Sequence, residues 1–244
     1  MNQQNNPFGA GSAYSDQTSG AVTYDAGLRA HMIRLFNAVA AGLAVSGVAA
    51  YAVYSIPPLA ALFMNPIFSI VLLIGLMGFL WFGMNPNKLL QQSLSAVRTK
   101  YYIFTTLLGA SLAYIFAVYT GDSVVRVFFI TAAAFAGTSL LGYTTKRDLT
   151  GMGSFLLMGL IGIILASLVN MFLKSSGMAF VISILSVLIF TGLIAFETQT
   201  AKRMYNAANS DDTNHKLAIV SALGLYINFI NLFQTLLRLF GDRR

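Results

Sequence analysis

The chain has 244 residues, of which 57% are hydrophobic and only 9% are charged, and it contains no cysteine. Soluble globular domains carry about 25% charged residues, so this composition excludes a typical soluble enzyme, and the lack of cysteine excludes disulfide bonds, thiolate metal sites and cysteine nucleophiles. The net charge of +7 comes from basic residues scattered between apolar runs, so we expect a polytopic membrane protein and no nucleic-acid partner.

The first 28 residues are rich in Asn, Gln, Ser and Gly and show almost no apolar periodicity. This composition predicts a disordered polar tail over residues 1–28, followed by a transmembrane domain over residues 29–244. A cleaved signal peptide is not expected, because the basic residues Arg29 and Arg34 follow the polar tail instead of preceding a short apolar core.

Seven apolar runs follow, and the charged residues lie mainly between them. Each run is long enough to cross a hydrocarbon layer of about 30 Å, so we expect an all-α membrane protein with seven transmembrane helices. The runs cover roughly residues 35–55, 67–84, 101–119, 125–143, 154–173, 178–197 and 217–240.

The basic residues are divided unequally between the two sides that alternating spans would define. With a cytoplasmic amino terminus, ten fall inside: Arg29, Arg34, Lys88, Arg98, Lys100, Lys146, Arg147, Lys202, Arg203 and Lys216. Five fall outside: Arg126, Lys174, Arg238, Arg243 and Arg244. The positive-inside rule therefore predicts a cytoplasmic amino terminus. A re-entrant hairpin formed by the last run is an alternative that would bring the carboxyl terminus inside as well.

Small residues recur at every fourth position in three runs, which lets helix backbones approach closely in lipid. They are Gly42, Ser46 and Ala50 in the first run, Gly109, Ala113 and Ala117 in the third, and Gly162 and Ala166 in the fifth. The pattern predicts close packing and a compact bundle more than a wide aqueous pore.

The last run carries less apolar residues along one helical face. Ser221, Gly224, Asn228, Asn231, Thr235 and Arg238 follow one another at alternating spacings of three and four. Unpaired amides in lipid are unfavourable, so this face should turn inward and place the last helix near the middle of the bundle. Asn228 and Asn231 could then line a solvated pathway or form interhelical hydrogen bonds worth about 1 kcal/mol each.

Glu197 ends the sixth run within Phe196-Glu197-Thr198-Gln199. It has no basic neighbour within four residues, whereas Asp122 is close to Arg126 and Asp148 adjoins Arg147. An ionisable residue at the edge of a membrane span is a candidate functional residue.

These segments together resemble the Bax inhibitor-1 family, also called the transmembrane BAX inhibitor motif family. FETQ at residues 196–199 and GLYINFINLFQTLLRLFG at residues 224–241 look like its carboxyl-terminal signature, and residues 142–170 are similar to bacterial members. The resemblance covers roughly residue 25 to the end. It implies seven helices with the last one central.

The resemblance also implies a calcium leak controlled by pH through two acidic residues. Glu197 matches the first acid, as Glu where Asp is usual, and would be the calcium-binding residue. The second acid belongs to the family pattern LYLDFINLF, where this chain has Asn228. An amide does not titrate, so the site has lost one negative charge and the shared proton of a carboxylate pair.

Enzymatic motifs are not found. His31 and His215 are placed by the pattern in polar connections beside membrane spans, and a metal cluster of His215 with Asp211 and Asp212 is much less favoured than a solvated loop. We therefore expect a protein that is not an enzyme and has no cofactor.

Two functional hypotheses remain. The first is a pH-modulated calcium or other cation leak channel of the cytoplasmic membrane, with Glu197, Asn228 and Asn231 on the ion pathway, calcium as the permeant ion and the lipid bilayer as surroundings. The alternative is a non-transporting membrane protein that binds and modulates other membrane proteins, such as a quality-control protease.

Overall fold

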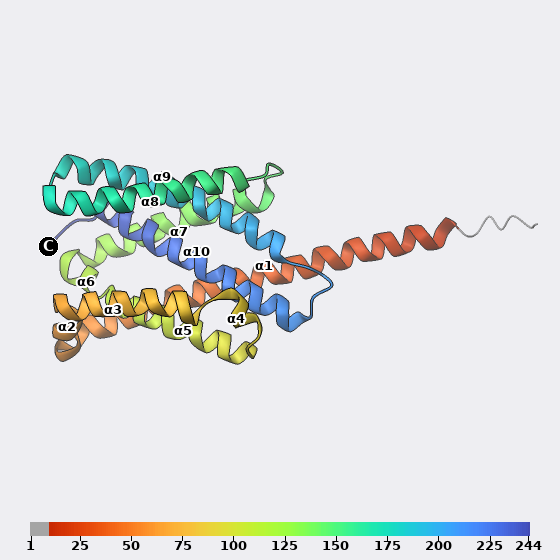
Figure 1. The fold of residues 1–244 in the computed structure, drawn as a ribbon, viewed down its shortest axis with the longest axis horizontal. Helices are drawn as coiled ribbons and strands as arrows, with labels where there is room; N and C mark the ends of the chain where they lie inside the picture. The colour runs from red at the N-terminus through yellow and green to blue at the C-terminus, as the bar shows by residue number, and fades with distance from the viewer. Residues whose placement is uncertain (1–9) are drawn as a thin grey trace, which may run out of the picture.

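A computed structural model describes residues 10–244, with side chains from residue 26 onward except those of residues 86 and 87. The described residues form helices joined by short connections and no strand (Figure 1). Seven helical segments are long and apolar enough to cross a membrane, which confirms the predicted fold class. They are α1 (Ala10–Ser55), α3 (Pro66–Gly78) with the π-helical turn η1 (Phe79–Gly83), α5 (Leu94–Ser111) with α6 (Tyr114–Val118), α7 (Gly121–Thr144), α8 (Thr150–Leu173), α9 (Ser176–Met204) and α10 (Asp211–Phe240). The short helices α2 (Pro57–Phe63) and α4 (Pro86–Leu90) lie in the connections around α3.

Several helices begin before the apolar run that predicted them. α5 starts after Ser93, whose side chain accepts a hydrogen bond from the Ala96 backbone N–H, and α10 starts after Ser210, which accepts one from Thr213. Hydroxyl side chains at this position satisfy backbone donors that the helix leaves free. The capping residue therefore determines the start of the helix, and the first turns of α5 and α10 are polar.

The segment predicted to be a disordered tail contains the start of α1. Helix α1 begins at Ala10, so residues 10–28 are helical where irregular structure was expected. Residues 1–9, the remainder of that segment, lie outside the described residues.

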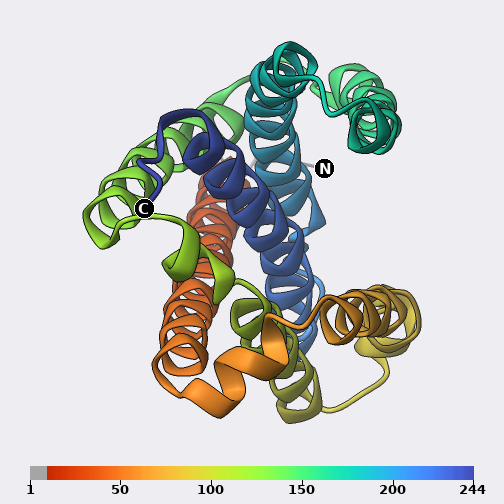
Figure 2. The same ribbon diagram turned by 90° about the vertical axis from the view of Figure 1, so that its left-hand side faces the viewer.

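Helix α10 occupies the middle of the bundle. In the end-on view it is surrounded by α1, α5, α7 and α9, while α3 and α8 lie at the periphery (Figure 2). Leu225, Tyr226 and Leu232 of α10 have no exposed surface, and the helix buries a larger share of its residues than any other described span. The predicted central position of the last helix is therefore confirmed.

The outer surface is strongly apolar on the peripheral helices. Phe172 of α8, Ile67 of α3 and Trp81 of η1 are 81%, 75% and 77% exposed. Exposure of such large apolar surfaces to water is unfavourable, whereas contact with the apolar chains of lipids is not. This protein is a multi-pass membrane protein.

Two of the three stripes of small residues follow the expected packing. Ser46 of α1 and Gly109 of α5 meet so closely that a side chain at Gly109 would overlap the Ser46 backbone. The Ser46 hydroxyl lies 2.8 Å from the carbonyl oxygen of Thr105 and 2.6 Å from the Tyr226 hydroxyl, which joins α1, α5 and α10. Gly162 of α8 has open space around it among the described residues, so the third stripe makes no comparable contact.

We expect Gly109→Ala to destabilise the protein by about 1–3 kcal/mol, because the added methyl group must push α5 away from α1. Gly162→Ala is the matched control: its methyl group meets nothing within 4 Å and removes backbone freedom from a helix, so its effect should be neutral or slightly stabilising. The thermal unfolding midpoint of each purified variant in detergent measures the difference. Equal midpoints for the two variants would contradict close α1–α5 packing.

The two ends of the bundle differ in charge and in their connections. The α7–α8 and α9–α10 connections share one end, where Arg34 pairs with Asp211 and Arg203 pairs with Asp148. The carboxyl terminus lies at the other end, where the Thr120 backbone N–H donates to the carbonyl oxygen of Asp242. Since α10 is continuous from Asp211 to Phe240, the re-entrant alternative for the last run is excluded.

Candidate functional site

Glu197 of α9 points towards the central helix. Its carboxylate lies over Gly224 of α10, where an added Cβ atom would be 2.9 Å from Glu197 Oε2. The Asn228 side chain, one turn further along α10, lies beside the same carboxylate. The absence of a side chain at Gly224 therefore leaves the space that the carboxylate occupies between the two helices.

The polar atoms of this pair are shielded from solvent. Glu197 Oε2 and Asn228 Nδ2 are buried and have no hydrogen-bond partner among the described residues. The structure also shows no ion pair of Glu197 within the described part of the chain; Lys88, in the short helix α4 that follows the second span, is exposed. Buried polar groups in proteins are normally satisfied, so this pair has unused capacity to bind a proton, water or a cation.

Asn231 lies in a different environment from Glu197 and Asn228. It is half-buried and lines a mainly apolar pocket of about 380 Å³ between α8, α9 and α10, whose other polar residues are Ser167, Ser186, Thr235 and Arg238. The predicted polar face is thus divided: Asn228 and Thr235 are buried, Ser221, Gly224 and Asn231 are half-buried, and Arg238 is exposed. The most deeply buried face of α10 carries aromatic and aliphatic residues instead.

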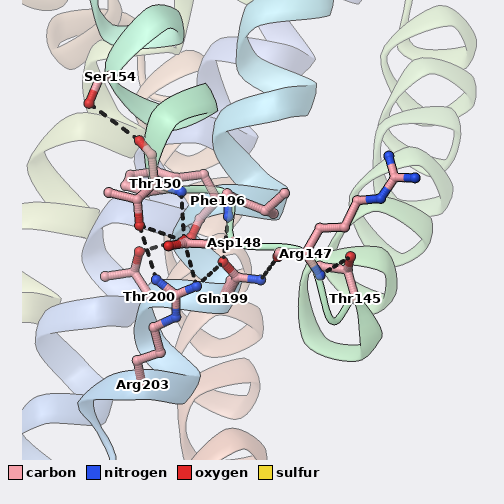
Figure 3. A network of polar contacts seen from close by, with 10 residues as sticks. Thr145, Arg147, Asp148, Thr150, Ser154, Phe196, Gln199, Thr200 and Arg203 are labelled. Atoms are coloured by element: carbon pink, nitrogen blue, oxygen red, sulfur yellow. Dashed lines mark hydrogen bonds and ion pairs between the residues drawn. The ribbon is translucent and has the colours of Figure 1, made fainter.

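A hydrogen-bond network lies two residues beyond Glu197 and joins α9 to the α7–α8 connection (Figure 3). Gln199 is buried, and its Oε1 accepts hydrogen bonds from the Leu149 backbone N–H at 2.9 Å and from Arg203 at 2.6 Å. Its Nε2 donates to the carbonyl oxygen of Arg147 at 2.8 Å. One amide side chain therefore holds the connection against the end of α9. The FETQ string already contained Gln199, but nothing in the string indicated these partners.

The acidic residues near the ends of the spans pair with distant arginines. Asp148 pairs with Arg203 at 2.7 Å, and Asp242 pairs with Arg126 at 2.8 Å, so the ion pairs do not join Asp148 to its sequence neighbour Arg147 or Arg126 to the nearby Asp122. The hydrogen bonds from Thr150 and Arg203 hold the pKa of Asp148 well below its usual range. The Asp148 carboxylate therefore stays charged at any physiological pH.

The expected location of the histidines was wrong, because both lie within helices. His31 of α1 is buried, and its Nδ1 is 3.1 Å from the carbonyl oxygen of Asn214, while His215 lies in the second turn of α10. The residues that the structure describes include no group of three His, Asp or Glu side chains able to hold a metal ion. A cation near Glu197 would depend on amide and backbone oxygens for its other ligands.

Comparison with known proteins agrees with this architecture. The family model for Bax1-I, described as inhibitor of apoptosis-promoting Bax1, matches residues 28–244. The chain is 44% identical to a protein of Caulobacter vibrioides over 98% of this chain and 99% of the relative. It is 42% identical to a protein of Rickettsia prowazekii over 93% and 95% of the two chains. It is also 40% identical to the inner membrane protein YbhL of Escherichia coli, over 90% and 94%.

Proposed function

The chain belongs to the Bax1-I family, and we propose that it is a pH-modulated calcium or cation leak channel of the cytoplasmic membrane with a weakened acidic site. The observation that carries the proposal is the Glu197 side chain of α9, whose carboxylate faces the central helix α10 with Oε2 buried and has no cationic partner among the described residues. A charge at such a depth is costly and is normally kept for ion or proton movement.

The proposed pathway runs from this carboxylate along the polar face of α10 towards the carboxyl-terminal end of that helix. Asn228 supplies an amide oxygen beside Glu197, and the proposed entrance on the carboxyl-terminal side is the pocket that contains Asn231 and Thr235 among mainly apolar residues. Oxygen atoms from carboxylates, amides and hydroxyls are the ligands that calcium prefers. Arg238 at the rim opposes cation entry, so the leak should be slow. We propose no enzymatic activity and no resident cofactor.

Calcium flux into liposomes tests the proposal directly. The purified full-length protein in liposomes loaded with a calcium-sensitive dye should admit calcium faster than empty liposomes, at a rate that changes with external pH. Liposomes that are no more permeable than the empty control at any pH would favour the alternative, a non-transporting protein that binds other membrane proteins.

We also propose that the amino terminus and the α7–α8 and α9–α10 connections are cytoplasmic, and that the membrane is the inner one, as the name of the Escherichia coli relative states for that protein. The support is the ten-to-five distribution of basic residues.

Single cysteines at two matched glycines measure this orientation, since the chain has no cysteine of its own. Gly151 and Gly177 lie in the first turns of α8 and α9, are exposed, and have open space for a side chain among the described residues. In whole cells, an impermeant maleimide should label Gly177→Cys and spare Gly151→Cys until the membrane is permeabilised. The opposite labelling pattern would show that the topology is the reverse of the proposed one.

A further inference from the structure

A second polar pocket lies at the other end of the bundle, between α1, α5 and α10, and the proposed ion pathway does not use it. Its volume is about 430 Å³, and its lining includes Arg34, Asn37, Arg98, Tyr101, Tyr102 and His215. Three basic side chains from three different helices thus converge on one opening, beside two tyrosine rings.

Of the two arginines in this pocket, one is neutralised within the described structure and the other is not. Arg34 pairs with Asp211 at 2.6 Å, but Arg98 has no acidic partner among the described residues. Instead, Arg98 Nη2 donates a hydrogen bond to His215 Nε2 at 2.9 Å. The ring holds the guanidinium in position without cancelling its charge, so the pocket keeps a net positive charge.

The pocket lies at the depth of lipid headgroups. Arg34 precedes Ser55, the last residue of α1, by 21 residues, and this length of helix rises about 32 Å, close to the hydrocarbon thickness of about 30 Å. Arg98 and His215 lie in the second turns of α5 and α10, at the same end. A basic pocket between membrane helices at this level is suited to an anionic lipid headgroup.

We propose that this pocket binds the phosphate group of an anionic phospholipid, with Arg98 as the principal ligand and Arg34 and Asn37 as further donors. A guanidinium forms two parallel hydrogen bonds to phosphate, which gives both affinity and orientation. The acyl chains of the bound lipid lie along the exposed surface of α5 beside Tyr102, which is 39% exposed. This site is separate from Glu197 and does not depend on calcium conduction.

Thermal unfolding of the full-length protein in a nonionic detergent tests the proposal. Dioleoylphosphatidylglycerol should raise the unfolding midpoint in a saturable way, and dioleoylphosphatidylcholine, which has the same chains and a zwitterionic headgroup, should have little effect. Inorganic phosphate shows whether the bound phosphate group must belong to a lipid. If phosphate at millimolar concentration raises the unfolding midpoint in a saturable way, a free phosphate compound fits the pocket. If it has no effect, the lipid chains are required.

Three variants locate the binding. Arg98→Gln should raise the apparent Kd for phosphatidylglycerol about tenfold or more, and Arg98→Lys, which keeps the charge but loses the paired hydrogen bonds, should have an intermediate effect. Arg147→Gln is the matched control, because Arg147 is exposed at the same end of the bundle and outside the pocket. Equal Kd values for Arg98→Gln and Arg147→Gln, or equal stabilisation by the two lipids, would overturn the proposal. If Arg98→Gln does not fold, Arg98→Lys decides between these outcomes.

Discussion

Asn228→Asp is expected to increase calcium flux and to make its dependence on pH steeper, whereas Glu197→Gln is expected to lower the flux about tenfold or more and to remove the dependence on pH. The two side chains already lie beside each other between α9 and α10, so an acid at residue 228 would face Glu197 directly. Two carboxylates at this separation share a proton and titrate as a pair, and together they attract a divalent cation more strongly than one does.

The sign of the pH effect in the unmodified protein follows from the single carboxylate. Protonation of Glu197 removes the only negative charge of the site, so cation attraction and flux should fall as the pH falls. Because one group titrates, the change should extend over about two pH units, and the Asn228→Asp variant should change more sharply.

Calcium entry into dye-loaded liposomes, measured between about pH 5 and pH 8, gives both the flux and its dependence on pH. Asp122→Asn is the control, since Asp122 is an exposed acid in the first turn of α7, at the opposite end of the bundle from the α9–α10 connection. It should leave flux and pH dependence unchanged. Unaltered flux in both Glu197→Gln and Asn228→Asp would refute the ion-site proposal and favour the protein-binding alternative.

Gln199→Leu should lower the thermal unfolding midpoint by about 5 °C or more, the second large effect that the structure predicts. The substitution removes the acceptor of the Leu149 backbone N–H and the donor to the carbonyl oxygen of Arg147, and it fills a buried position with a side chain that forms no hydrogen bond. Each buried group left without a partner costs about 1–3 kcal/mol.

Asp148→Asn provides the contrast within the same network. Its ion pair with Arg203 is exposed, and exposed ion pairs contribute little to stability, so the midpoint should hardly change. The low pKa of Asp148 adds a pH test: a carboxyl whose pKa is depressed by folding contributes stability above its unfolded pKa of about 4, and this contribution is lost only as the pH falls further towards the folded value.

The ordinary pKa of an aspartate is about 4, so the ion pair of Asp148 with Arg203 should stay intact between about pH 5 and pH 8. The flux of Asp148→Asn should then show the same dependence on pH as that of the unmodified protein. Thermal unfolding and calcium flux, measured on both Gln199→Leu and Asp148→Asn, separate the contribution of the Gln199 hydrogen bonds from that of the Asp148–Arg203 ion pair. A larger loss of stability in Asp148→Asn than in Gln199→Leu would show that the ion pair, and not the amide, holds the α7–α8 connection.

The amino-acid sequence was sufficient to predict the membrane class, the seven spans and the central place of the last helix. Long apolar runs must form helices in lipid, since every backbone polar group has to be satisfied within its own segment, and two amides on one helical face require a protein environment. The polar face and the isolated acid singled out Asn228 and Glu197, and the resemblance to the Bax inhibitor-1 family implied that Asn228 stands where an acid is usual.

The polar groups that meet across the bundle could be identified only in three dimensions. Asp148 and Arg203 are 55 residues apart, Arg98 and His215 are 117 apart, and no periodicity within one helix relates such partners. The polar face of α10 was correctly recognised as one face, but its members contact different neighbours: Asn228 lies beside Glu197 of α9, and Asn231 lies in the pocket between α8 and α9. Helix rotation and crossing are set by side-chain packing across the whole bundle, here by the contact of Gly109 with Ser46, and a single sequence does not contain that information locally.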